Sequence, residues 1–291
     1  MEKRKFAIVT DSSCDMPKSF YEEHGVEVVN LGFTMNNVNY EGESGEKIEE
    51  KEFYRLLREG SMPTTYQVTA EIAKPHIEKF LSEGKDVLVL TFSSGLSGTA
   101  GSFIVAGREL SKAYPKRKIC VVDTLCASMG EGLLLYYAVK KADEGASLEE
   151  TKEYVEGLKL HICHHFTVDN LFHLKRGGRV STATAIVGSM LKIKPIMHVD
   201  NEGKLIAIGK AMGRKKSLSM LVENLFASAD MDEDDPIFIS HGDCMEDVEY
   251  VKRLILEKRP TANIVVYYVG AVIGAHSGAG TVALFNKGHQ R

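Results

Sequence analysis

Residues 86–99 read DVLVLTFSSGLSGT, an unbroken apolar run that passes into a turn rich in glycine and hydroxyl side chains. A continuous apolar run of this length is typical of a strand that is covered on both faces in a parallel sheet. Helical spacing follows from Thr99 to Ala113, so the turn joins a strand to a helix. The stretch predicts one strand–turn–helix unit of an α/β fold.

The same unit recurs before and after this stretch. Apolar runs at residues 6–10 (FAIVT) and 118–123 (KICVVD) each lead into a polar turn and then into a helical pattern. Strands that alternate with helices predict a right-handed, mostly parallel sheet with helices on both faces. The polar residues 36–49 indicate an excursion from this sheet, and a charged helical pattern over residues 148–159 ends it. We therefore predict an N-terminal three-layer α/β/α domain over residues 1–160.

The second half of the chain has a different pattern. Residues 161–168 alternate roughly between polar and apolar side chains, as in a half-exposed strand, and residues 197–208 predict a hairpin. These patterns favour a largely antiparallel sheet. Because a single core stops growing near ~250–300 residues, a length of 291 residues also favours two domains. We predict that residues 161–291 form a C-terminal α/β domain.

Composition narrows the class of protein. The formal net charge is -4 and the pI is about 6.2, which argues against a nucleic-acid-binding protein, since such proteins carry a basic stripe. No apolar run reaches the ~18–20 residues that span a bilayer, and the N-terminus does not read as a signal peptide. The five cysteines are odd in number and form no CxxC pair, as expected of free thiols. The sequence indicates a cytoplasmic protein with no transmembrane segment.

The turn SSGLSGT at residues 93–99 is a candidate anion site. Ligands on parallel sheets lie outside the carboxyl ends of the strands, where this turn falls together with Asp11 and Asp123. Hydroxyl groups and free backbone N–H groups at the start of a helix suit a carboxylate or a phosphate. Capping of the helix by serine or threonine is the simpler alternative.

Two further turns contain residues that could bind a ligand. GAHSGAG at residues 274–280 allows close backbone approach and offers His276, although a lone histidine in a turn is often structural. The segment GAGTVA at residues 278–283 fits a dinucleotide pattern, but only eight residues follow it, too few for a βαβ unit. LKRGGRV at residues 174–180 presents two arginines that suit a carboxylate, a phosphate or an acidic partner, or that form a solvated basic turn.

Sequence motifs for phosphate-loop nucleotide binding, nucleophilic catalysis and metal binding are absent. The sequence has no GxxxxGK[ST] phosphate loop and no GxSxG nucleophile elbow. His161, Cys163, His164 and His165 are close in sequence, but alternation along a strand divides them between two faces, so we expect no metal site there.

Five segments in this order resemble the DegV family over nearly the whole chain. They are IVTDSSCD (8–15), SSGLSGT (93–99), VVDT (121–124), LKRGGR (174–179) and IGAHSGAG (273–280). The resemblance implies a parallel-sheet domain, a second domain with a largely antiparallel sheet, and a long-chain fatty acid buried between them. It also implies a binding subunit that performs no chemistry alone and needs no cofactor, because a separate ATP-dependent fatty acid kinase subunit phosphorylates the bound carboxylate.

The resemblance also assigns residues. The hydroxyl groups that hold the carboxylate are expected at Thr65, Ser93 and Ser94, and the family's histidine corresponds to His276. The arginines that face the partner or its phosphate correspond to Arg176, Arg179 and Arg214.

The sequence departs from the family pattern at two places. The usual Thr-Ser-Gln-Pro reads Thr65-Tyr66-Gln67-Val68, which brings a bulky ring close to the expected head-group site. The usual Gly-Pro-Gly reads Gly278-Ala279-Gly280. Loss of both prolines removes backbone restriction from these loops.

Two alternative functions stay open at this point. One is a stand-alone hydrolase or transferase in which Ser93 or Ser94 acts with His276, which would require a close Ser–His contact and an orienting carboxylate. The other is a carrier of a different hydrophobic acid.

Overall fold

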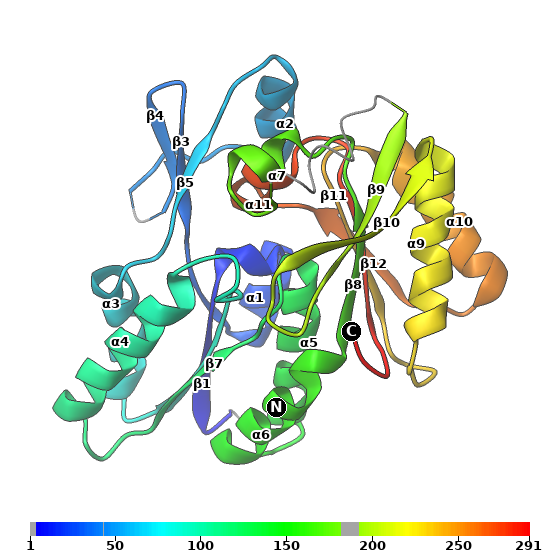
Figure 1. Cartoon of the computed structure of the whole chain (residues 1–291). Helices are drawn as coiled ribbons and strands as arrows, with labels where there is room; N and C mark the ends of the chain where they lie inside the picture. The colour runs from blue at the N-terminus through cyan, green and yellow to red at the C-terminus, as the bar shows by residue number, and fades with distance from the viewer. Residues whose placement is uncertain (1–3, 43, 182–191) are drawn as a thin grey trace.

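The computed structural model describes residues 4–42, 44–181 and 192–291. It contains a parallel sheet in the N-terminal half, a larger and mostly antiparallel sheet in the C-terminal half, and a small third sheet beside the first (Figure 1). The predicted two-domain α/β architecture is confirmed.

The N-terminal sheet has the strand order β2-β1-β6-β7, and every neighbouring pair is parallel. Along β1 and β6, alternate side chains enter two different cores: Ile8 and Leu88 face one, and Val9 and Val89 face the other. Both faces are therefore covered, as the continuous apolar runs predicted. The strands are β1 (Phe6–Asp11), β2 (Glu27–Val29), β6 (Asp86–Thr91) and β7 (Ile119–Asp123).

Helices cover both faces of this sheet. Helices α3 and α4 pack on one face, and α5 and α6 pack on the other. A capping box formed by Ser147 and Glu150 begins α6. The bounds are η1 (Ser12–Cys14), α1 (Lys18–His24), α2 (Glu50–Arg58), α3 (Ala70–Ser82), α4 (Thr99–Ala113), α5 (Met129–Asp143) and α6 (Leu148–Leu158).

The excursion predicted over residues 36–49 lies outside the parallel sheet, and it includes a strand that the sequence did not predict. Two short strands, β3 (Gly32–Met35) and β4 (Val38–Glu41), form a hairpin, and β5 (Thr64–Tyr66) pairs with β3. The resulting antiparallel sheet has the order β4-β3-β5. Its position matters for function because β5 contains Thr65, which we had expected in a loop.

The C-terminal sheet has the order β10-β9-β8-β13-β11-β12 and is antiparallel except for the β11–β12 pair. The hairpin predicted around residues 201–203 is confirmed as β9–β10. The half-exposed strand predicted at residues 161–168 is wrong: every residue of β8 is buried. The elements are η2 (Lys159–His161), β8 (Ile162–Thr167), α7 (Phe172–Arg176), β9 (Ile193–Val199), β10 (Leu205–Met212), α9 (Arg214–Ser228), β11 (Ile237–His241), α10 (Met245–Lys258), β12 (Ile264–Tyr268), α11 (Ala271–Ser277) and β13 (Val282–Lys287).

Helix α5 explains why β8 is buried. It packs on the parallel sheet and also contacts β8, β11 and β13 of the second sheet, whose other face is covered by α9 and α10 (Figure 1). One apolar core therefore extends from Ile8 through Leu134 to Phe285, across both halves of the chain. The chain passes from one sheet to the other between α6 and β8, and the boundary at residues 160 and 161 stays our proposal.

Candidate functional site

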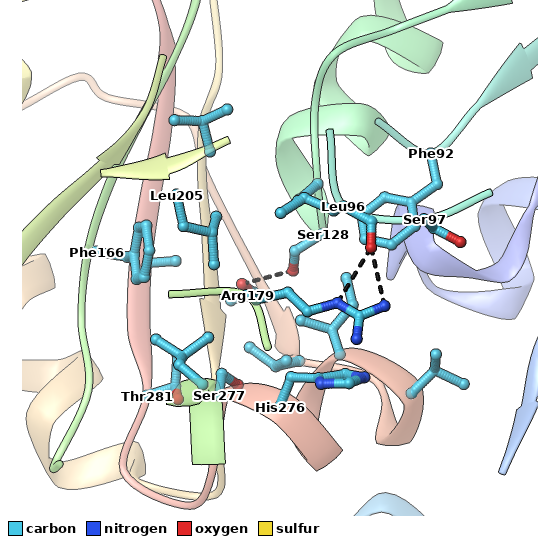
Figure 2. A pocket seen from close by; sticks show the side chains of 18 of the residues that line it. Phe92, Leu96, Ser97, Ser128, Phe166, Arg179, Leu205, His276, Ser277 and Thr281 are labelled. Carbon is cyan, nitrogen blue, oxygen red and sulfur yellow. Dashed lines mark hydrogen bonds between the residues drawn. The ribbon is translucent and has the colours of Figure 1, made fainter. Parts of the chain in front are cut away.

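A cavity of about 190 Å³ lies between the two halves of the molecule. Most of its wall is apolar and comes from both halves, with Phe92 and Leu96 on one side and Phe166 and Leu205 on the other (Figure 2). Polar side chains from β5, from the turn after β6 and from the α7 and α11 regions also line it. An elongated apolar molecule with a small polar end fits such a lining.

Thr65 and His276 meet in this cavity although 211 positions separate them in sequence. The Thr65 Oγ1 atom lies 2.8 Å from His276 Nε2. Pairing of β5 with β3 directs Thr65, while α11 packs against β5 and brings His276 to it. Of the expected carboxylate-binding residues, the structure thus brings these two together.

His276 is neutral at physiological pH in this environment. Burial is the largest cause that lowers its pKa to about 4, and the positive charges of Arg179 and Arg176 contribute to the same shift. Its other ring nitrogen, Nδ1, is buried and has no hydrogen-bond partner among the described residues. A Cβ atom at Gly177 would lie 2.0 Å from that nitrogen, so glycine is required there for the imidazole to keep its place.

The serines expected to bind the carboxylate do not line the cavity. The Ser93 hydroxyl is fully buried and donates a hydrogen bond to the Gly203 carbonyl at 2.8 Å, so it ties the turn to the β9–β10 hairpin. Ser94 is exposed, and its backbone N–H donates to Asp123 Oδ1. In this structure both side chains therefore lie outside the cavity wall, whereas Leu96 and Ser97 of the same turn are part of it.

Ser97 is the serine of this turn that lines the cavity. Its hydroxyl lies 2.9 Å from Thr99 Oγ1 and accepts a hydrogen bond from the Thr99 backbone N–H at the start of α4. It therefore combines a hydroxyl group with a helix N-terminus, as the sequence predicted for an anion site in this turn. The signal was present, since Ser97 belongs to the SSGLSGT segment.

The three arginines have different positions. Arg179 lines the cavity, and its Nε and Nη2 atoms donate to the Leu96 carbonyl at 3.1 and 2.9 Å (Figure 2). This corrects the expectation that the Gly-Gly turn presents it outward. Arg176 donates to the Pro63 and Ala275 carbonyls and lies outside the lining, at an exposed position.

Arg214 lies farther from the cavity. Its guanidinium forms an ion pair with Asp247 at 2.8 Å and donates to the Gly280 carbonyl. Both contacts lie within the protein, so the Arg214 side chain connects the start of α9 with α10 and with the glycine-rich turn at residues 274–280.

Tyr66 does not fill the head-group region. Its ring packs over Gly32 and Gly42, where a Cβ atom would come within 2.2 Å at Gly32 and 3.1 Å at Gly42. The residue is 39% exposed, so the ring forms part of the rim of the cavity.

The polar side chains at the strand ends hold the backbone. Asp11 accepts hydrogen bonds from the Ser13 and Phe92 backbone N–H groups at 3.0 and 2.8 Å. Burial raises its pKa to about 6, and these hydrogen bonds oppose the rise. Asp11 therefore fixes the start of the 93–99 turn and does not face the cavity.

His164 and His165 face opposite sides of β8, as the alternation predicted. The two nitrogens of His164 pair with the Ala127 N–H and the Ile162 carbonyl, while His165 contacts Ser228 of α9. No group of three metal-ligating side chains occurs in residues 4–42, 44–181 and 192–291. Within the same ranges, none of the helices combines the length and the apolar character needed to cross a bilayer.

Comparison with known proteins gives a consistent result along the whole chain. Residues 5–287 match the family described as "Uncharacterised protein, DegV family". A DegV domain-containing protein of Clostridium perfringens is 43% identical, and a protein of Thermotoga maritima named fatty acid-binding protein is 33% identical. The alignment with the Clostridium perfringens protein covers 98% of both chains, and the alignment with the Thermotoga maritima protein covers 96% of both chains.

A solved structure is also similar. A DegV family protein from Thermus thermophilus, described by its fatty acid binding, superposes with a TM-score of 0.88 at 31% identity, and the match covers 98% of this chain and 99% of that chain. With the family match and relatives of this identity over the full length, the chain belongs to the DegV family.

Proposed function

We propose that the protein binds one long-chain fatty acid in the cavity between its domains. The observation that carries the proposal is the cavity itself, in which a mostly apolar wall ends at Thr65, Ser97 and His276. The Thermotoga maritima and Thermus thermophilus relatives, which are described as fatty-acid-binding proteins, support the same ligand class.

The tail supplies most of the affinity. Burial of about 14 methylenes at ~0.8 kcal/mol each contributes roughly 11 kcal/mol before the costs of ordering. The polar end then needs only to position the carboxylate, because a buried carboxylate without hydrogen bonds protonates or is expelled.

The carboxylate accepts hydrogen bonds from Thr65 and Ser97 and lies near the charge of Arg179. The Thr65 hydroxyl is free to donate once its present contact with His276 Nε2 opens or reverses. Arg179 keeps a positive guanidinium in the wall, which favours the ionised acid. The bound carboxylate in turn favours a protonated His276 and so raises its pKa from about 4.

The protein then presents the head group to a separate ATP-dependent fatty acid kinase. Thr65 is half-buried and its neighbours Tyr66 and Gln67 are exposed, so the polar end of the cavity lies near the surface. His276 contacts a threonine, and its Nδ1 atom has no carboxylate partner among the described residues, which does not favour hydrolysis by a serine–histidine pair.

Titration of delipidated protein with palmitate and oleate tests the binding proposal. We expect saturation at one acid per chain and a large loss of affinity for the methyl esters, which lack the charge. No saturable binding of either acid would overturn the proposal. A second assay adds a bacterial fatty acid kinase subunit and ATP, and acyl phosphate formation that depends on this protein supports the kinase role.

A further inference from the structure

A pair of buried serines forms a second polar site in the wall of the cavity. Ser128 precedes α5 in the N-terminal half, and Ser240 lies on β11 in the C-terminal half. Their hydroxyl oxygens are 2.9 Å apart, and the Ser128 hydroxyl donates to Asp15 Oδ2 at 2.6 Å. Figure 2 shows Ser128 in the cavity wall. Asp15, Ser128 and Ser240 thus form a hydrogen-bonded chain that ends at the cavity.

Two residues of this hydrogen-bonded series have unfavourable backbone conformations. Asp15 has a φ of 51° and Ser128 a φ of 53°, both in the region that favours glycine. Such conformations persist only where the surroundings enforce them, and they cluster at functional sites. Here the Gly270 backbone N–H and the Ser128 hydroxyl hold the buried Asp15 carboxyl from two sides.

This serine pair is separate from the head-group residues. The hydrogen bonds of Thr65, Ser97 and Arg179 described above involve neither serine. The other polar side chains around the pair are occupied: both His164 nitrogens have partners, and Thr281 donates to the Gly278 carbonyl at 2.8 Å.

The hydroxyl of Ser277, also in the cavity wall, can form further hydrogen bonds. Ser277 lines the cavity, is only 6% exposed, and its Oγ atom has no hydrogen-bond partner among the described residues. A purely apolar tail leaves the Ser277 hydroxyl without a partner, which is unfavourable in a dry cavity, and it makes no use of the remaining hydrogen-bonding capacity of the serine pair.

The direction of the hydrogen bonds decides which ligand group fits. With Asp15 ionised, Ser128 donates to Asp15 and Ser240 donates to Ser128, so the pair offers only lone pairs to a ligand. With Asp15 protonated, the direction reverses and Ser240 offers its proton. A hydroxyl group both donates and accepts, so it fits either direction, whereas a carbonyl fits only one.

We propose that the Ser128–Ser240 pair is a binding site for a hydroxyl group on the acyl chain, so that the ligand class includes long-chain hydroxy fatty acids. This inference rests on the proposed fatty-acid-binding function. The carboxylate stays with Thr65 and Ser97, and the chain passes the serine pair with its hydroxyl at one defined distance from the head group.

Competition binding with a panel of monohydroxystearates, which carry the hydroxyl at different carbons, tests the proposal against stearate as reference. In an apolar cavity every isomer binds about 10-fold or more weakly than stearate, because its hydroxyl loses hydrogen bonds to water. We expect one isomer, or two adjacent ones, to bind within about 3-fold of stearate or more tightly.

The variant Ser240→Ala is expected to weaken the favoured isomer by about 10-fold while stearate binding stays unchanged. Ser240→Cys, which keeps the size and weakens the hydrogen bond, gives a smaller loss in the same direction. Ser111→Ala is the matched control, since the Ser111 hydroxyl donates only to the Gly107 carbonyl on α4 and does not line the cavity.

Uniformly weak binding of all hydroxystearates alongside normal stearate binding overturns this inference and leaves the proposed function intact. An isomer preference that Ser240→Ala and Ser240→Cys leave unchanged also overturns it. Failure of every acid to bind, stearate included, overturns the proposed function and this inference together. The isomer profile of the wild-type protein needs no variant, so the test does not depend on the stability of the substituted chains.

Discussion

Replacement of Ser97 by alanine is expected to weaken fatty acid binding far more than replacement of Ser93. Ser97 lines the cavity beside the start of α4, whereas the Ser93 hydroxyl is committed to the Gly203 carbonyl at 2.8 Å. A hydrogen bond to a charged group contributes about 1.5–3 kcal/mol, so Ser97→Ala raises the Kd about 10- to 100-fold.

The two variants also differ in their effect on stability. Ser93→Ala leaves the buried Gly203 carbonyl without its donor, which costs about 1–3 kcal/mol, or a fall in Tm of roughly 2–5 °C. Ser97→Ala removes a hydroxyl that accepts a hydrogen bond from the Thr99 backbone N–H, which costs about 1 kcal/mol. Ser94→Ala changes neither property much, because the Ser94 side chain is exposed.

Isothermal titration of delipidated protein with palmitate gives the Kd, and thermal unfolding of the ligand-free protein gives the Tm. The two measurements separate a binding role from a structural one for each serine. A normal Kd for Ser97→Ala together with a greatly raised Kd for Ser93→Ala would refute the assignment of the head-group site.

Three further predictions follow from other contacts. Gly177→Ala is expected to displace the imidazole of His276 and to weaken palmitate binding about 10-fold, because the added Cβ would lie 2.0 Å from His276 Nδ1. Gly101→Ala is the control, since its added Cβ meets no other atom, and it is expected to leave the Kd unchanged. Equal Kd values for the two variants contradict a role of Gly177 in positioning His276. Burial raises the pKa of Asp15 to about 8 in the folded protein, so the folded state retains a proton that the unfolded chain loses above about pH 4, and stability falls as the pH rises towards 8. The variant Asp15→Asn is neutral at every pH, so its free energy of unfolding, measured by urea denaturation, is expected to rise relative to that of the wild type. The difference grows by up to ~1.4 kcal/mol per pH unit between pH 5 and 8 and then levels off. A difference that does not depend on pH contradicts the raised pKa of Asp15. Arg291→Ala is expected to lower the Tm by roughly 5–10 °C, because its guanidinium donates to the Leu125, Lys159 and Asp200 carbonyls of both halves. Arg259→Ala, whose guanidinium donates to carbonyls within the C-terminal half alone, is expected to lower the Tm by less; similar losses contradict a role of Arg291 in joining the halves.

The sequence was sufficient to predict the architecture because the apolar runs and helical patterns that indicate it are long and lie within single segments of the chain. The runs at residues 86–91 and 119–123 are continuous enough to indicate strands covered on both faces, and the spacing from Thr99 to Ala113 gives α4 with its observed bounds. The small β4-β3-β5 sheet escaped prediction because its strands have only three or four residues, and β4 and β5 have mostly polar, partly exposed side chains.

Tertiary contacts account for the other errors. Burial of β8 depends on α5, which comes from the other half of the chain, so no pattern within residues 162–167 reveals it. The choice among Ser93, Ser94 and Ser97 depends on the path of a single turn, which spacing does not determine. Thr65 and His276 were expected to converge, and they do, because the family resemblance supplied a long-range relation that the residues alone do not contain.

The direct test of the central claim is denaturing mass spectrometry of the purified protein after organic extraction, combined with native mass spectrometry of the intact complex. The account predicts about one long-chain fatty acid per chain, lost on delipidation and regained on addition of palmitate or oleate. Protein that carries no lipid and takes up neither acid would contradict it.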